Sequence, residues 1–176
     1  MSDKIKVAYM LGSLNRGGTE TLMLDTFGRK DLLPDCVCIY RKTGVFEKDF
    51  QATGLRMLKI APTRNIIAYL KALRQAIVNE QINIVHAQQP IDALYAFLAC
   101  LRLNIKIALT LHGYDFSADK MGGLILKFIL PRTTANIYVS HHVKDYYSKK
   151  YHLKSERQFV IYNGVSFSKI IEKDIN

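Results

Sequence analysis

The sequence of 176 residues contains no long uninterrupted apolar run. A membrane-spanning helix needs roughly 18 or more consecutive apolar residues, and the most apolar region, residues 82–101, is interrupted by Asp92. Residues 1–6 are polar and lead directly into an apolar, strand-like run, which does not fit a cleavable signal peptide. We therefore expect a protein that stays in the cytoplasm, where it is made.

Cysteine is also scarce, with three residues at positions 36, 38 and 100, each inside an apolar run. A free thiol in apolar surroundings behaves as a small hydrophobic group. The Cys36-Val37-Cys38 spacing has no histidine nearby to complete a metal site. We expect no metal ion here and a reducing compartment.

Acidic residues are fewer than basic ones, 15 against 25, so the formal net charge is +10. Such a surface attracts phosphates, nucleic acid or anionic lipid headgroups, although a plain solvated lysine-rich surface explains it equally well. Residues 1–88 carry 13 basic and 8 acidic side chains, and residues 89–176 carry 12 and 7. This even spread argues against a dedicated basic tail, and we expect no nucleic-acid partner.

Short apolar runs alternate with segments of helical periodicity along the chain. The apolar runs occupy residues 5–11, 36–40, 55–60, 82–87, 105–111, 135–140 and 159–162. One helix follows Gly17-Gly18, and others are expected at residues 46–52, 65–80, 90–101, 122–130 and 143–151. Strands that are apolar throughout and alternate with helices predict a parallel sheet covered on both faces. The fold class is therefore α/β, a Rossmann-like doubly wound sheet of about seven strands in a single domain.

Residues directly after the strands are the candidates for function, because ligands bind beyond the carboxyl ends of the strands in such sheets. Gly17 and Gly18 stand between the first strand and a helix, where bare backbone and a helix N-terminus let amide groups approach a phosphate. The loop matches neither the dinucleotide fingerprint nor the P-loop. An ordinary glycine turn is an equal alternative.

Histidine and amide side chains follow three other strands. His112 could bind a hydroxyl or handle a proton, or it could be an ordinary loop histidine. His86 and Gln88 follow the preceding strand, and glutamine suits sugar hydroxyls because it both donates and accepts hydrogen bonds. Asn163 follows the last strand, where a tight turn is the simpler explanation.

Five segments, taken in order, resemble the N-terminal half of family-4 GT-B glycosyltransferases and together span residues 4–167. They are Asn15-Arg16-Gly17-Gly18-Thr19-Glu20, Ile84-Val85-His86, Thr110-Leu111-His112-Gly113, Tyr138-Val139-Ser140 and Val160-Ile161-Tyr162-Asn163-Gly164-Val165. The resemblance implies a retaining transferase in which two Rossmann-like domains face a cleft. The N-terminal domain binds the acceptor, and the C-terminal domain binds the nucleotide sugar.

The same resemblance implies a role for each candidate residue. His112 would be catalytic and face the transferred sugar, while Gly17 and Gly18 would lie near the donor diphosphate. The acceptor and sugar-binding residues would be Arg16, Glu20, His86, Gln88, Tyr114, Asp115 and Asn163. No cofactor or metal is implied apart from the sugar nucleotide, and the acceptor would be a sugar or a lipid-linked glycan, as in the synthesis of bacterial surface polysaccharides.

Residues 1–166 are expected to form this domain, with residues 167–176 beginning a linker toward a second domain. The glutamates stand at positions 20, 47, 80, 156 and 172, without the spacing of the family's paired-glutamate motif, which belongs to the other half. The chain by itself is therefore expected to be inactive.

Two other functions remain open, together with a contact to the membrane. The chain could be half of a GT-B-fold nucleotide-sugar epimerase, or a stand-alone Rossmann-like or flavodoxin-like nucleotide-binding module. The module is disfavoured because Arg41-Lys42 stand where an acidic ribose partner is expected. The apolar segment at residues 121–130 (MGGLILKFIL) could rest on anionic lipid at the inner face of the membrane, although an ordinary buried helix has the same pattern.

Overall fold

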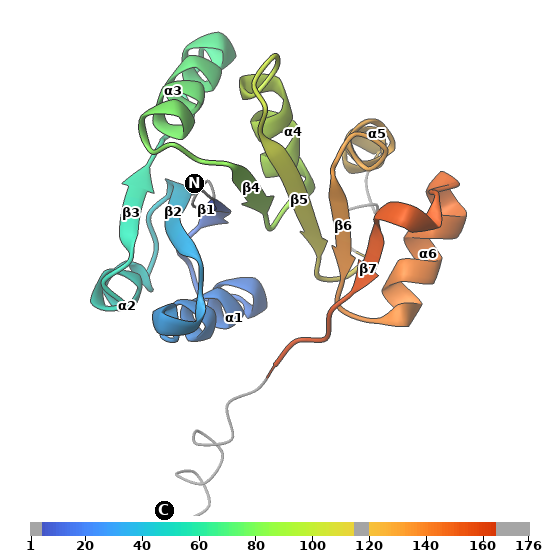
Figure 1. The fold of residues 1–176 in the computed structure, drawn as a ribbon, viewed down its shortest axis with the longest axis horizontal. Coiled ribbons are helices and arrows are strands. Elements are labelled where there is room, and N and C mark those ends of the chain that lie inside the picture. The colour runs from blue at the N-terminus through green and yellow to red at the C-terminus, as the bar shows by residue number, and fades with distance from the viewer. Residues whose placement is uncertain (1–4, 115–119, 165–176) are drawn as a thin grey trace, which may run out of the picture.

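The structure, a computed structural model, describes residues 5–114 and 120–164. Seven parallel strands form one sheet in the order β3-β2-β1-β4-β5-β6-β7 (Figure 1). The strands are β1 (Lys6–Ser13), β2 (Asp35–Lys42), β3 (Arg56–Lys59), β4 (Ile84–Ala87), β5 (Lys106–Leu111), β6 (Ala135–Tyr138) and β7 (Gln158–Val160). The predicted doubly wound parallel sheet of seven strands is confirmed.

Six α-helices connect the strands in the described part of the chain. They are α1 (Gly18–Phe27), α2 (Glu47–Ala52), α3 (Ile66–Asn79), α4 (Pro90–Ala99), α5 (Lys120–Ile129) and α6 (His141–Tyr151). Local chemistry fixes several helix starts: the Asn65 side chain accepts hydrogen bonds from two amides of α3, Ser140 caps α6, and proline opens α4. Among the described helices, none is long and apolar enough to cross a membrane.

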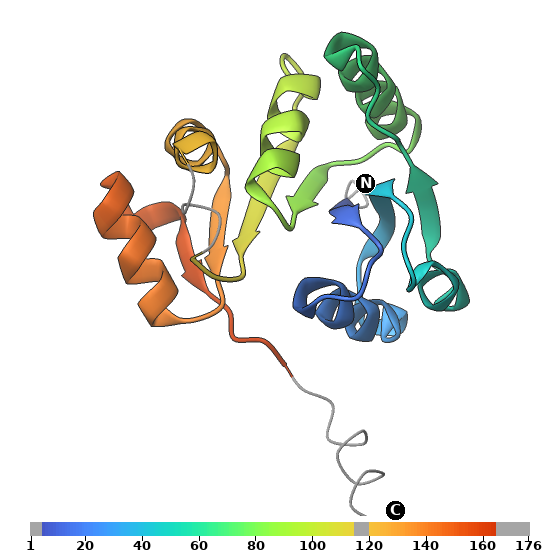
Figure 2. The ribbon, with the colours of Figure 1, turned by 180° about the vertical axis from the view of Figure 1, so that it is seen from behind.

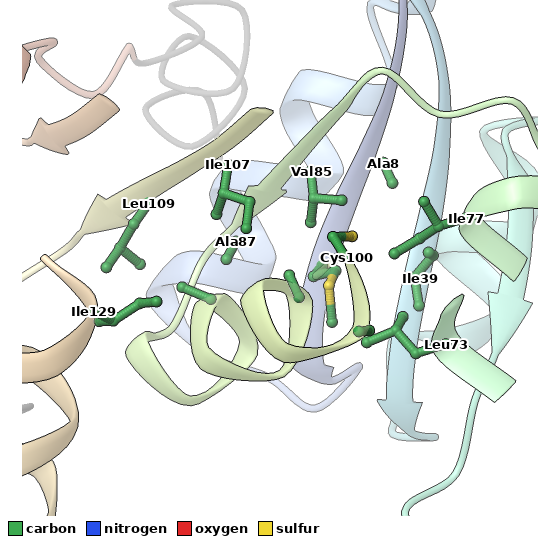
Figure 3. Packing of buried hydrophobic residues seen from close by; sticks show 14 of the residues in the cluster. Ala8, Ile39, Leu73, Ile77, Val85, Ala87, Cys100, Ile107, Leu109 and Ile129 are labelled. Carbon is green, nitrogen blue, oxygen red and sulfur yellow. The ribbon is translucent and has the colours of Figure 1, made fainter. Parts of the chain in front are cut away.

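Helices cover the sheet on both faces, because alternate strand residues point to opposite sides (Figures 1 and 2). On one side, α1 and α2 pack on β1 and β2 through a cluster that includes Leu11, Phe27 and Phe50. On the other side, α3, α4 and α5 pack on a larger cluster (Figure 3). Its members include Ala8, Ile39, Leu73, Ile77, Val85, Ala87, Cys100, Ile107, Leu109 and Ile129.

The strand order reverses next to β1, which pairs with β2 on one side and with β4 on the other. Ligands bind at such a reversal, beyond the carboxyl ends of the strands. An ion pair links two elements beside this reversal. The Arg41 Nε atom lies 2.7 Å from the Asp92 Oδ1 atom, and Asp92 is fully buried. Arg41 also donates to the Gln89 side chain at 3.1 Å, so the pair joins the end of β2 to the start of α4.

Gly44, in the turn between β2 and α2, lies directly against the loop that follows β1. The amide of Leu14 donates to the Lys42 carbonyl at 3.1 Å, and the Phe46 amide donates to the Leu14 carbonyl at 2.9 Å. A Cβ atom at Gly44 would overlap with the backbone of Leu14 and Asn15. Because Gly44 has no side chain, the backbone at the start of the glycine loop can pack directly against it.

We expect Gly44→Ala to lower the free energy of unfolding by about 1–3 kcal/mol, because backbone atoms must move to admit the methyl group. Gly123→Ala is the matched control, since a Cβ atom there meets only the Tyr151 hydroxyl at 3.9 Å, an ordinary contact. Urea unfolding of both variants measures the difference. Equal stability of the two variants would contradict the tight packing at Gly44.

Candidate functional site

A cavity of about 240 Å³ opens at the carboxyl edge of the sheet, between α1 and the ends of β4, β5 and β6. The segment after β7 closes one side of it. Its lining residues are Tyr9, Leu22, Met23, Thr26, His86, Gln88, Thr110, His112, Ile137, Ile161, Tyr162, Asn163 and Gly164. Polar side chains from neighbouring strands therefore meet an apolar wall at the edge where ligands are expected.

Two hydrogen-bonded pairs from neighbouring strands form the polar wall of the cavity. The His86 Nε2 atom lies 2.7 Å from the Thr110 Oγ1 atom, and the His112 Nε2 atom lies 2.9 Å from the Gln88 Oε1 atom. The first pair joins β4 to β5, and the second joins the residues that directly follow these two strands. Because every second residue of a strand shares a face, the two pairs follow one another toward the carboxyl edge.

Both imidazoles are uncharged near neutral pH. Burial, and secondly the neighbouring His112, lowers the pKa of His86 from its ordinary value of 6.5 to about 4. Burial also lowers the pKa of His112. A neutral imidazole has one nitrogen that donates and one that accepts, so each ring can exchange hydrogen bonds with an uncharged hydroxyl, and it carries no charge to attract an anion.

The lowered pKa of His86 predicts a loss of stability in mild acid. Below about pH 6.5 the unfolded chain takes up a proton at His86 that the folded chain does not bind until about pH 4, so stability falls across this range. Between about pH 7 and pH 5, the shifted pKa of His86 should lower the free energy of unfolding by about 2 kcal/mol. Urea unfolding should show a smaller acid sensitivity for His86→Gln, and the same pH dependence in both proteins would contradict it.

The glycine loop lies at the same edge, beside the cavity rather than in its wall. Gly17 has an extended backbone and precedes Gly18, the first residue of α1. A Cβ atom at Gly18 would meet nothing within 4 Å, whereas one at Gly17 would overlap with the carboxylate of the buried Glu20. Arg16 is exposed and its guanidinium lies 5.6 Å from the centre of the Phe46 ring. The surface above Gly18 is therefore open on this side.

The structure brings four of the predicted site residues into one cavity: His86, Gln88, His112 and Asn163. Tyr114 does not line it, and its ring packs instead against α6, with centroid distances of 4.9 Å to Tyr146 and 5.9 Å to His142. Asp115 lies outside the described residues. Apart from these two, the predicted candidates form a cavity group and a glycine-loop group at one edge of the sheet.

Among the lining residues that sequence reasoning missed, two lie directly against His86. Thr110 is the partner of His86, and the signal for it was present, because it is the one hydroxyl within the apolar run of β5. Tyr9 lines the cavity with its ring centroid 5.3 Å from that of His86. Tyr9 carried no signal in the sequence, since an aromatic residue in a strand is ordinary core material.

A larger cavity, of about 390 Å³, lies beside the amino ends of β6 and β7, between Leu130 and Gln158. This is the opposite edge of the sheet from the one where doubly wound folds bind ligands. Across residues 5–114 and 120–164, no three histidine, cysteine or acidic side chains are grouped in a way that could hold a metal ion. The carboxyl-edge cavity is therefore the candidate site.

The sequence profile of Glycosyltransferase Family 4 matches residues 34–169, which is more than half of the chain. The chain belongs to glycosyltransferase family 4. The match includes the segments after β4, β5, β6 and β7 that form most of the cavity. No curated protein sequence matches the chain significantly.

Solved structures share the fold of this family-4 domain at low sequence identity. A glycosyltransferase from Rickettsia africae matches with a TM-score of 0.78 and 19% identity over 99% of this chain and 47% of its own. Anabaena HepE, solved with UDP and glucose, matches with a TM-score of 0.78 and 13% identity over 93% of this chain and 46% of its own. The lipopolysaccharide outer core galactosyltransferase WaaB matches with a TM-score of 0.71 and 16% identity over 93% and 47%.

The family-4 chain spans about half the length of these structures. The fold is the Rossmann-like α/β architecture of one half of a GT-B enzyme. The same architecture also occurs in a UDP-N-acetylglucosamine 2-epimerase, which matches with a TM-score of 0.60 and 15% identity over 90% of this chain and 48% of its own. These structural matches establish the fold, while the family profile assigns the chain to its family.

Proposed function

We propose that this chain is the acceptor-binding half of a retaining glycosyltransferase that moves a sugar from a nucleotide sugar to a glycan or lipid-linked acceptor. The observation that carries the proposal is the cavity at the carboxyl edge, where His86, Gln88 and His112 converge in a chain that belongs to family 4. Anabaena HepE, which shares the fold, was solved with UDP and glucose and with UDP-glucose, which supports a nucleotide sugar as donor. A second domain would supply most of the donor site.

Transfer of this kind depends on positioning and electrostatics more than on a strong base. The sugar leaves as a species with positive charge near its anomeric carbon, while the diphosphate gains negative charge. In the proposed mechanism, neutral His112 and Gln88 hold hydroxyls of the transferred sugar. The start of α1 at Gly17 and Gly18 offers backbone amides and the positive end of a helix to the diphosphate.

Transfer assays on this chain combined with its second domain test the proposal. We expect acceptor-dependent release of nucleoside diphosphate, with retained configuration at the anomeric carbon of the product, and we expect the 176-residue chain alone to be inactive. Transfer by this chain alone would overturn the division of labour between two halves. Failure of the combined halves to transfer any sugar would overturn the proposed function itself.

The epimerase is the second candidate, favoured by the structural match to a UDP-N-acetylglucosamine 2-epimerase. It is distinguished by its products, since an epimerase converts a nucleotide sugar without any acceptor and without releasing the nucleotide. The stand-alone nucleotide-binding module is distinguished by titration of this chain with a dinucleotide, because tight binding would favour the module over the acceptor-binding half of a transferase.

We also propose that the enzyme acts in the cytoplasm, in the synthesis of bacterial surface polysaccharides, and that it contacts the membrane peripherally. Helix α5 supports the membrane contact. Its apolar side chains at one spacing are exposed rather than buried: Met121 by 67%, Leu124 by 62% and Phe128 by 39%. Arg132 lies over the Phe128 ring at 4.0 Å, and Lys127 is exposed on the same helix. An apolar stripe flanked by cations is the pattern of helices that lie in the headgroup region of anionic bilayers.

We expect this chain to co-sediment with anionic phosphatidylserine-containing vesicles at low salt, and less at high salt because the headgroup attraction is screened. Leu124→Glu should weaken binding by removing apolar area from the stripe and adding a negative charge. Ile67→Glu is the matched control, since Ile67 is 61% exposed on α3. Binding that ignores lipid charge, or equal loss in both variants, would count against a membrane surface on α5.

A further inference from the structure

Gln88 is the least exposed polar residue in the wall of the cavity, with 1% of its surface accessible. Its backbone amide donates to the Met10 carbonyl at 3.2 Å, which ties the residues after β4 to β1. Its side-chain oxygen lies 2.9 Å from the His112 Nε2 atom. Its Nε2 atom is buried and has no hydrogen-bond partner among the described residues.

This geometry determines where the imidazole proton of His112 lies. An amide oxygen only accepts hydrogen bonds, so the His112 Nε2 atom must carry the hydrogen that Gln88 receives. Burial lowers the pKa of His112, so the ring is neutral near pH 7 and has a single N–H group. The Nδ1 atom is then the acceptor, and the hydrogen bond that the described residues give to this ring is the one at Nε2.

We propose that Gln88 is a positioning residue that keeps the proton of His112 on Nε2 and leaves Nδ1 as the acceptor for a sugar hydroxyl. The inference rests on the proposed function and adds to it the chemical group that is recognised. A hydroxyl can donate a hydrogen bond to Nδ1, whereas an anionic oxygen cannot.

The neighbouring pair provides an internal comparison. His86 also bonds through Nε2, but its partner is the Thr110 hydroxyl, which can either donate or accept. The hydroxyl therefore does not dictate which His86 nitrogen carries the proton, and the amide oxygen of Gln88 does dictate it for His112. The two hydrogen-bonded pairs of the polar wall therefore differ: the partner fixes the position of the imidazole proton in His112 but not in His86.

Nitrogen-15 NMR of the histidine side chains in this 176-residue chain tests the proposal without any transfer assay. Near pH 7.5, His112 should show a single tautomer with the proton on Nε2. Gln88→Met removes the acceptor at similar volume and should produce a mixture of tautomers. Gln88→Glu places a carboxylate beside the ring and should raise the measured pKa of His112 by roughly 1–3 pH units.

Thr110→Val is the control, because it should alter the signals of His86 and leave the tautomer of His112 unchanged. A wild-type chain with the proton on Nδ1 would overturn the proposal, since the Gln88 amide would then be reversed. An unchanged tautomer in Gln88→Met, with the pKa also unmoved in Gln88→Glu, would overturn it as well. Failure of the transfer assay leaves these signals unaffected, so the two proposals fail separately.

Discussion

Replacing His112 by alanine should lower the rate of sugar transfer in the complete enzyme by about 100-fold or more. The imidazole is neutral, partly buried and hydrogen-bonded to Gln88 at the cavity wall, so its position is fixed before the reaction begins, and His112→Ala removes this preorganised contact. Because charge separates only as the glycosidic bond breaks, kcat should fall much more than KM for the acceptor rises. Steady-state kinetics with varied acceptor measures both constants.

His152→Asn is the matched control for that substitution. His152 is exposed at the end of α6, in the left-handed backbone region that asparagine also tolerates, and it lies beside the opposite edge of the sheet. This variant should retain wild-type kcat. A His112→Ala enzyme whose acceptor KM rises while kcat is unchanged would assign His112 to acceptor binding alone.

Replacing Gly18 by valine should impair the donor side instead, raising KM for the nucleotide sugar by about 10-fold or more. A Cβ atom at this position would meet nothing within 4 Å, so in the proposed mechanism the space above it is open to the diphosphate and to the second domain. A β-branched residue there would occupy this space and block the close approach to the amides at the start of α1. Varied donor at saturating acceptor gives the constant.

Gly123→Val tests whether any effect comes from a β-branched residue in a helix rather than from its position. Gly123 lies in α5, away from the cavity, where a Cβ atom makes one ordinary contact. Both variants should unfold at similar urea concentrations, and only Gly18→Val should lose donor affinity. Equal donor constants for wild type and Gly18→Val would remove the glycine loop from the donor site.

The sequence predicted the elements well because most strands are apolar runs and several helices, among them α3, α4 and α6, have a start signal of their own. Most of the differences lie at the boundaries. The run at residues 135–140 was expected to be strand throughout, but β6 ends at Tyr138 because Ser140 caps α6. The last strand was expected at residues 159–162 and is Gln158–Val160, since only this part pairs with β6. Apolar periodicity indicates an element but does not fix the residue at which pairing stops.

The sequence could not predict whether the apolar side chains of α5 are buried or exposed. The apolar pattern of residues 121–130 fits a buried helix and a surface-seeking helix equally well. Leu126 and Ile129 are buried while Met121 and Leu124 are exposed, so the helix has two apolar sides of which the sheet covers only one. Only the packing of neighbouring elements decides which side faces solvent.

The sequence by itself determined the family, the parallel sheet and the edge at which the candidate site lies, because these follow from residue order and from chemistry just after each strand. Tertiary structure decided which candidates meet. His86, Gln88, His112 and Asn163 share one cavity, whereas Tyr114 packs on α6. Pairing of β4 with β5 sets the distances between side chains 24 residues apart, and no local pattern encodes that register.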